Sequence, residues 1–290
     1  MTLDAALKAA VEARLGRRIV KAETCSGGDI NQAFRIDFFD GDPAFVKTNP
    51  RAPRNLFATE ARGLEWLREA NTLRIPHVLT VTGADEAPQF LVLEFIQPGR
   101  PTRGFDEQLG QGLAALHRTH PREFGFEQDN FIGSLPQQNS PCSSWANFYR
   151  SQRLEPQFKR AVDTRQLSYA LRRNFEGLCE RLPELVGPAE PPARLHGDLW
   201  GGNLHVDERG APCLIDPAVY GGHREVDLAM MRLFGGFSES VFASYQEAYP
   251  LSPGAAERVA LYQLYPLLVH VNLFGGGYVG SVERAIARYA

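Results

Sequence analysis

The sequence has few cysteines, and they follow no pattern. Its four cysteines, Cys25, Cys142, Cys179 and Cys213, are far apart and form no CxxC pair or cluster with histidine. This spacing argues against a zinc site and against a disulfide framework, and it favours a reducing, cytoplasmic location. The seven histidines show no HxxxH or similar grouping, so we expect no histidine metal site.

The chain also lacks a long apolar run and a strong net charge. No segment approaches the ~18 apolar residues that a membrane span needs, and the N-terminus does not have the pattern of a signal peptide. We therefore expect no membrane partner. Lys and Arg (31) nearly balance Asp and Glu (34), which gives a formal net charge of -3. The net charge is too small to attract nucleic acid to the whole surface, so any preference for a partner must come from a particular site. The sequence does not indicate an oligomeric state.

The residue pattern of the 290-residue chain changes near residue 97, from mostly strand-like to mostly helical. Before it, helical spacing is found at 3–15 and 54–70, and β-branched or aromatic runs are found at 17–24, 31–39, 43–49, 77–85 and 89–96. Pro98, Gly99 and Pro101 mark a connector. Beyond it, helical spacing is found at 106–119, 145–153, 164–182, 225–234, 238–249 and 254–274, with β-like segments only near 203–206 and 212–215. We predict an α+β fold with a small β-rich lobe at 1–96 and a larger helical lobe at 97–290.

The stretch "RLHGDLWGGNLHV" holds the clearest chemical signal. Asp198 and Asn203 are five positions apart, and "CLIDPAVYGG" then supplies Asp216. Protein kinases use this layout for phosphoryl transfer, with one carboxylate that accepts the proton of the attacking alcohol and oxygen ligands that hold Mg²⁺. Asp198 fits the first part, and Asn203 and Asp216 fit the second. The alternative is that these side chains only cap turns.

A second pattern lies in the predicted β-rich lobe. Lys47 stands in the apolar strand "AFVKT", where an unpaired lysine is costly to bury. Glu60 lies on the inward face of the next helix, three residues after Phe57 and four before Leu64. A pair between Lys47 and Glu60 would offset the cost of burying the ammonium and the cost of burying the carboxylate. Kinases use such a pair to position phosphates. An ordinary solvated pair is the alternative.

Two backbone segments fit a nucleotide. The turn "CSGGDINQA" places Gly27 and Gly28 where a phosphate-covering loop would sit, although it is not a G-x-G-x-x-G motif and also suits a plain hairpin turn. The strand "LVLEFI" ends at the connector, so the backbone of Glu94, Phe95 and Ile96 is placed to bind an adenine edge. An ordinary final strand explains the second segment equally well.

Three further residues have less specific expectations. We predict a structural role for Asp227, as an acceptor for the backbone of the loop around Asp198, and a loop-ordering role for His196. Cys25 adjoins the glycine-rich turn, whose N–H groups could lower the pKa of its thiol and make it redox-active. An inert cysteine is the alternative.

The motifs "HGDLWGGN", "LIDPAVYGGHREVDLAM", "LFGGF", "DNFIGSLPQQN" and "YQLYPLLVHVNLFGGGY" resemble those of the fructosamine kinase (ketosamine 3-kinase) family over nearly the whole chain. That family is related to aminoglycoside phosphotransferases and has a protein-kinase-like fold. The resemblance implies ATP-dependent phosphorylation of a sugar hydroxyl in a ketosamine, the Amadori product of glycation, which then leaves the amine. Carried over by residue, it implies a proton acceptor at Asp198, Mg²⁺ ligands at Asn203 and Asp216, phosphate positioning by Lys47 and Glu60, and an adenine site at Phe95 and Ile96.

The sequence departs from protein kinases, since it has no HRD arginine, DFG sequence or activation segment. Phosphorylation of protein side chains is therefore not expected. For the substrate, we predict stacking on Trp200, with Asp29, Tyr220, His223 and Glu225 as neighbours; core packing is the alternative for Trp200. The acceptor would be a small ketosamine or a glycated protein. The remaining alternatives are another small-molecule kinase, acting on an aminoglycoside, choline or homoserine, and a nucleotide-binding pseudokinase.

Overall fold

The computed structural model describes residues 3–25 and 31–290, so the predicted Gly27, Gly28 and Asp29 lie outside the described residues. The first part contains Ala5–Leu15 (α1), Ile19–Thr24 (β1), Gln32–Phe38 (β2), Ala44–Thr48 (β3), Leu56–Glu69 (α2), Val78–Val81 (β4) and Phe90–Glu94 (β5). The strands form one antiparallel sheet in the order β1-β2-β3-β5-β4. Each of these elements lies within a segment that the sequence predicts.

The central strands β3 and β5 and most of β2 are buried on both faces, which explains their apolar runs, whereas the edge strands β1 and β4 are largely exposed or half-buried. On one face, Phe34, Ile36 and Val46 pack against Leu7 and Val11 of α1. That helix begins after Asp4, whose side chain accepts hydrogen bonds from two backbone N–H groups, and it ends at Gly16 with φ +64°, as expected. The other face turns toward α2 and carries the site.

The second part is mostly helical. Its elements are Phe105–His117 (α3), Asn130–Ile132 (β6), Leu135–Gln137 (β7), Trp145–Phe148 (α4), Tyr149–Leu154 (a π-helical turn, η1), Glu155–Asp163 (α5), Tyr169–Leu171 (η2), Arg172–Leu185 (α6), Ala193–Leu195 (β8), Gly201–Asn203 (η3), Leu204–Val206 (β9), Pro212–Leu214 (β10), Tyr220–Gly222 (β11), Glu225–Phe234 (α7), Glu239–Ala248 (α8), Ala255–Phe274 (α9), Gly276–Tyr278 (η4) and Val279–Tyr289 (α10). Strand β6 pairs with β7, β8 with β11, and β9 with β10.

Several predictions for this part are wrong in detail. The predicted helix at 164–182 begins only at Arg172, because α5 ends at Asp163 and the Ser168 side chain starts a new turn by accepting a hydrogen bond from Ala170 N–H. The β6–β7 hairpin, the β8–β11 pair and α10 were not predicted. These strands have three residues each, too few for alternation to stand out.

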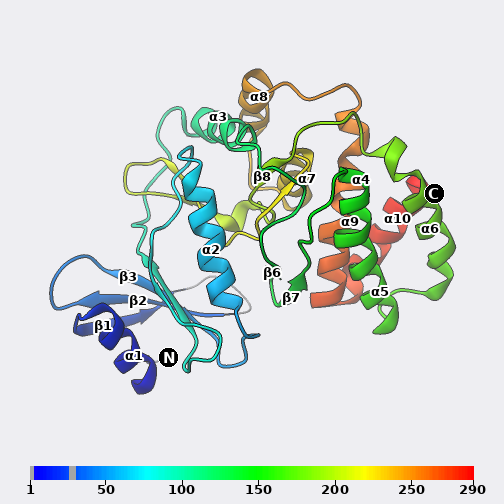
Figure 1. Cartoon of the computed structure of the whole chain (residues 1–290). Helices are drawn as coiled ribbons and strands as arrows, with labels where there is room; N and C mark the ends of the chain where they lie inside the picture. The colour runs from blue at the N-terminus through cyan, green and yellow to red at the C-terminus, as the bar shows by residue number, and fades with distance from the viewer. Residues whose placement is uncertain (1–2, 26–30) are drawn as a thin grey trace.

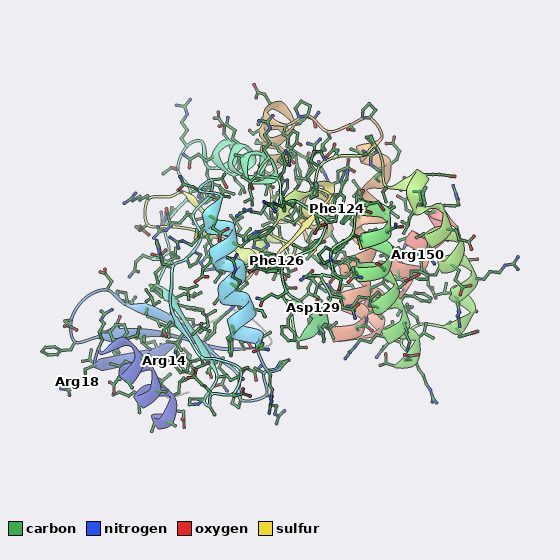
Figure 2. All side chains as sticks on the ribbon, viewed as in Figure 1. Arg14, Arg18, Phe124, Phe126, Asp129 and Arg150 are labelled. Atoms are coloured by element: carbon green, nitrogen blue, oxygen red, sulfur yellow. The ribbon has the colours of Figure 1, made fainter. Side chains whose placement is uncertain are left out.

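Helix α2 joins the two parts. In Figure 1 it stands between the five-stranded sheet and the C-terminal helices, and it contacts β4, β5 and β6. Trp66 of α2 makes an edge-to-face contact with Phe126, which is labelled in Figure 2, and their ring centroids are 5.1 Å apart. One hydrophobic cluster runs from α2 and β5 into the helical part, so the change of composition near residue 97 does not divide the core. Within the described residues, no helix has the length and apolar character that a membrane crossing requires.

Candidate active site

Lys47 is the centre of a buried charged group. Its Nζ lies 2.8 Å from Glu60 Oε1 and 2.6 Å from Asp216 Oδ1, and its side chain is 7% exposed. The lysine comes from β3, Glu60 from α2, and Asp216 follows β10. The expected Lys47–Glu60 contact is therefore present and is not a solvated pair, while the contact with Asp216 was not foreseen.

The charges of this group depend on one another. Burial alone would lower the pKa of Lys47, but the neighbouring Asp216 and Glu60 carboxylates outweigh it and raise that pKa. Burial also raises the pKa of Glu60, against the opposing effect of Lys47. Lys47 is therefore fully charged and is held between two carboxylates, in a position to meet an anion that enters beside them.

Asp198 lies at the start of the loop between β8 and β9. Asn203 Nδ2 donates to the Asp198 backbone carbonyl at 2.8 Å and approaches its carboxylate at 3.4 Å. Burial, followed by the charges of Asp216 and Asp227, raises the pKa of Asp198 to about 7. A carboxyl with such a pKa is suited to accept a proton near neutral pH.

Asp227 of α7 is hydrogen-bonded to the backbone at the start of the loop that carries Asp198. Its carboxylate accepts hydrogen bonds from His196 N–H at 2.8 Å and from Gly197 N–H at 2.9 Å, and His117 Nε2 lies 3.2 Å away. Burial would raise the pKa of Asp227, but the hydrogen bonds from His117 and the backbone lower it, so it stays ionised. These contacts agree with the structural role predicted for it.

His196 ties the loop to the strand before Asp216. Its Nε2 lies 2.9 Å from the Ile215 carbonyl, which can only accept, so this nitrogen carries the proton and Nδ1 accepts from Asp198 N–H at 3.3 Å. Burial lowers the pKa of His196, which keeps it neutral. Both ring nitrogens are therefore hydrogen-bonded within the chain and neither is free for substrate, and the loop-ordering role of His196 stays a prediction.

Asn203 and Asp216 supply oxygen atoms to the same place. Asn203 Nδ2 donates hydrogen bonds to the backbone carbonyls of Asp198 and Asp216, so its Oδ1 is the atom that can bind a cation. Asp216 adopts φ +53°, a left-handed conformation that few residues other than glycine take, and one of its carboxylate oxygens is bonded to Lys47. Hard oxygen donors of this kind suit Mg²⁺, which completes its shell with water and phosphate oxygens.

A cavity of about 210 Å³ brings these groups together. It is lined by the middle of α2, by the β6–β7 hairpin, by the loop with Asp198 and Asn203, by residues 216–218 and by the end of α9. Lys47 and Glu60 form one side. Trp200 forms part of another side and is 42% exposed, so it is not packed in the core.

Three predicted substrate neighbours are elsewhere, and those predictions are wrong. Tyr220 is fully buried in β11, where its ring lies 3.8 Å from the guanidinium of Arg153. His223 stacks on Tyr262, and burial lowers its pKa to about 4. Glu225 is bound on two sides by the Arg258 guanidinium, at 2.6 and 2.8 Å. Pairing of β11 with β8 takes the chain after Ala218 into the core and away from the cavity.

The structure also bears on the predictions for the connector and for Cys25. Glu94 N–H donates to the His77 carbonyl at 2.9 Å, so this N–H is committed within the chain and is not free for adenine. The predicted adenine contact through the Glu94 carbonyl and through the backbone of Phe95 and Ile96 stays a prediction. Burial raises the pKa of the Cys25 thiol above 9.0, which is the opposite of the lowering that the redox hypothesis needs.

The sequence reasoning missed the far wall of the cavity. Phe131 of β6 and Phe274 of α9 line it, together with His270. His270 Nδ1 lies 2.8 Å from the Pro266 carbonyl, so Nδ1 carries the proton and Nε2 is an acceptor. Burial lowers the pKa of His270 and keeps it neutral. The motif "LLVHVNLF" was noted for its resemblance, but nothing in it alone indicates which of its residues reaches a cavity.

Comparison with known proteins agrees with this geometry. The family model described as fructosamine kinase matches residues 3–290. A probable ketoamine kinase of Synechocystis sp. is 40% identical over 277 residues, which cover 93% of this chain and 90% of that protein. The chloroplastic protein-ribulosamine 3-kinase of Arabidopsis thaliana is 37% identical over 274 residues, which cover 94% of this chain and 83% of that protein.

Solved structures show the same fold. A crystal structure described as a fructosamine-3-kinase of Thermobifida fusca superposes with a TM-score of 0.88 at 37% identity and covers 98% of both chains. The aminoglycoside phosphotransferase APH(4)-Ia has a TM-score of 0.65 at 16% identity and covers 98% of this chain and 99% of its own, a likeness that shows the fold alone. The predicted protein-kinase-like α+β fold is confirmed.

Proposed function

This chain belongs to the fructosamine kinase family, and on that premise we propose that it transfers the γ-phosphoryl group of ATP to a sugar hydroxyl of a ketosamine. The observation that carries the proposal is the meeting of two groups around one cavity. Lys47 with Glu60 and Asp216 forms the first, and Asp198 with Asn203 forms the second. The lysine group suits phosphates, and Asp198 suits an alcohol.

Each side chain then has a part in the transfer. Lys47, kept charged by its two carboxylates, binds phosphate oxygens. Asp198 orients the attacking hydroxyl and accepts its proton, for which its raised pKa is matched to neutral pH. Asn203 and Asp216 would hold Mg²⁺, which neutralises the charge of the phosphates when it is bound. Phe95 and Ile96 would border the adenine.

The far wall of the cavity suits a sugar on an amine. The exposed indole of Trp200 offers a flat face for stacking on the sugar, with Phe131 and Phe274 as further apolar surface. His270 Nε2 is a neutral acceptor for a hydroxyl. We propose that the phosphorylated ketosamine is labile and that its sugar part then separates from the amine. The enzyme would thereby remove glycation from small amines or proteins.

The test is ATP turnover with Mg²⁺ against fructosyl-lysine, ribulosyl-lysine, choline, homoserine and kanamycin, with Asp198→Asn as the blank. We expect turnover of a ketosamine that the blank lacks. Turnover of choline, homoserine or kanamycin alone would replace the proposal with another small-molecule kinase. ATP binding without turnover of any acceptor would favour a pseudokinase.

A further inference from the structure

A chain of buried amide side chains reaches the cavity at Asn130 and has no role in the reaction proposed above. Asn130, Gln137 and Asn139 belong to the motif "DNFIGSLPQQN" and are 5%, 1% and 1% exposed. Asp129 at the head of this motif, labelled in Figure 2, accepts a hydrogen bond from Asn139 N–H at 2.8 Å. Buried amides are stable only when their hydrogen bonds are satisfied, so their partners define their role.

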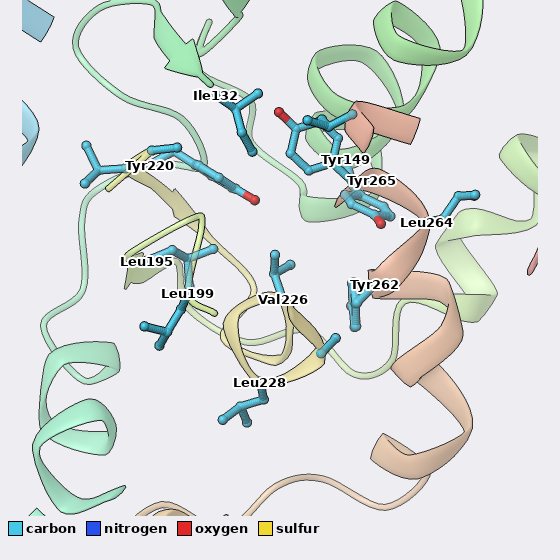
Figure 3. Packing of buried hydrophobic residues seen from close by; sticks show 14 of the residues in the cluster. Ile132, Tyr149, Leu195, Leu199, Tyr220, Val226, Leu228, Tyr262, Leu264 and Tyr265 are labelled. Carbon is cyan, nitrogen blue, oxygen red and sulfur yellow. The ribbon is translucent and has the colours of Figure 1, made fainter. Parts of the chain in front are cut away.

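Arg153 stands at one end of this amide chain. It lies in the π-helical turn Tyr149–Leu154 and is fully buried, and within the described part of the chain its guanidinium donates to carbonyl and amide oxygens and not to a carboxylate. Its guanidinium carbon lies 3.8 Å from the ring centre of Tyr220 and 5.5 Å from that of Tyr265, two members of the buried cluster in Figure 3. Its Nη2 donates to Asn139 Oδ1 at 2.7 Å.

Arginine can only donate, and this fixes the direction of every bond that follows. Because Asn139 Oδ1 accepts from Arg153, its Nδ2 is left to donate, and it does so to Asn130 Oδ1 at 2.9 Å. Asn130 Nδ2 must then donate onward, and it reaches the Val219 carbonyl at 2.9 Å. An amide with its oxygen and nitrogen exchanged would break the sequence of bonds at each step.

A second branch has the same direction. Tyr265 O–H of α9 donates to Gln137 Oε1 at 2.7 Å, so Gln137 Nε2 is the donor. That nitrogen donates to the Ala218 carbonyl at 3.1 Å and to Asn130 Oδ1 at 2.8 Å. Both branches therefore end on carbonyls of the short segment that directly follows Asp216.

That segment decides how Asp216 is presented. Asp216 stands at φ +53°, and Ala218 N–H donates to the His196 carbonyl at 2.9 Å, so the segment is also joined to the loop that carries Asp198. A left-handed aspartate persists only where its surroundings hold it. We propose that Arg153, Asn139, Asn130 and Gln137 form a polarised hydrogen-bond chain that positions Asp216 by holding the carbonyls of Ala218 and Val219.

This inference rests on the proposed function, since it concerns the residue assigned to Mg²⁺. The test is calorimetric binding of ADP, with Mg²⁺ and with EDTA, to the full-length wild type, Gln137→Met and Gln138→Met. Gln137→Met keeps the length of the side chain but removes its donor and its acceptor. Gln138→Met is the matched control, because the side chain of Gln138 is exposed.

We expect Mg²⁺ to tighten ADP binding in the wild type and in Gln138→Met. In Gln137→Met this gain, the ratio of the ADP dissociation constants with EDTA and with Mg²⁺, should be at least fivefold smaller than in the wild type. The dissociation constant of metal-free ADP should stay within twofold of the wild-type value. An unchanged gain, or an equal loss of metal-free binding, would overturn the positioning role. If Gln137→Met does not fold, Tyr265→Phe replaces it, and a gain equal to that of the wild type overturns the inference. A wild type that binds no ADP would refute the proposed function itself.

Discussion

Replacing Asp198 with asparagine should have opposite effects on catalysis and on stability. Burial with the charges of Asp216 and Asp227 raises the pKa of Asp198 from 3.8 to about 7. One pKa unit corresponds to about 1.36 kcal/mol, so ionising this carboxyl costs about 4 kcal/mol more in the folded chain than in the unfolded chain. Asparagine keeps the shape and carries no charge, so Asp198→Asn avoids this cost.

The sign of the effect follows from the bound protons. Between pH 3.8 and about 7 the folded chain keeps a proton on Asp198 that the unfolded chain has lost. The free energy of unfolding of the wild type therefore falls as the pH rises through this window, and the full cost is present above it. Asp198 borders the cavity, where water screens its charge, so we expect about half of the cost, roughly 2 kcal/mol at pH 8 and about 1 kcal/mol at pH 5.

Two assays test this pair of effects. Thermal unfolding of Asp198→Asn should occur about 4 °C above the wild type at pH 8 and about 2 °C above it at pH 5. Turnover of a ketosamine should fall by about 10²–10⁴-fold, the usual contribution of a general base. In the wild type, kcat/KM should rise as the pH passes about 7, because the base must be ionised. A stability difference that does not depend on pH, or a kcat within threefold of the wild type, would refute the reasoning.

Four further substitutions separate the roles of individual residues. Trp200→Ala should raise KM for the ketosamine about fivefold and leave KM for ATP unchanged, because the side chain is exposed and stacking contributes roughly 1 kcal/mol; steady-state kinetics with each substrate measure this. Lys47→Met should lower the free energy of unfolding by roughly 3 kcal/mol in urea titration, because it leaves the mostly buried Glu60 and the partly exposed Asp216 without a cation. Asp227→Asn should lower that free energy by about 2 kcal/mol and kcat by about tenfold, since it weakens three hydrogen bonds that hold the loop. Cys25→Ser and the wild type should show the same activity with and without reductant, because the raised pKa leaves little thiolate.

Local patterns in the sequence were enough to predict the first half of the site. Alternation along the strand places Lys47 on the α2 side of the sheet, and helical spacing places Glu60 on the inward face of α2. The directions of both side chains can therefore be predicted from the periods of two and 3.6 residues. The contact between Lys47 and Asp216 joins residues 169 positions apart, and no local pattern indicates it. Asp198 and Asn203 were found because a single loop carries both.

Proximity in the sequence misled where the chain changes direction. Tyr220, His223 and Glu225 follow Asp216 closely, which suggested a common site. Pairing of β11 with β8 instead turns this stretch into the core. The partner of Glu225 is Arg258, 33 residues further on. Neither the pairing of three-residue strands nor the partner of a buried charge can be derived from composition or periodicity.

The same strand pairing explains how a kinase-like site works without an activation segment. Only three residues separate Asp216 from β11, and β11 is hydrogen-bonded to β8, the strand that leads into the loop of Asp198. The proposed metal ligand and the proposed base are therefore joined through one short ladder, with Ala218 N–H bonded to the His196 carbonyl across it. In protein kinases, a long segment at this place becomes ordered on phosphorylation and controls activity. Here only three residues lie between Asp216 and β11, so this segment has no length of chain that phosphorylation could order, and we expect no control of that kind.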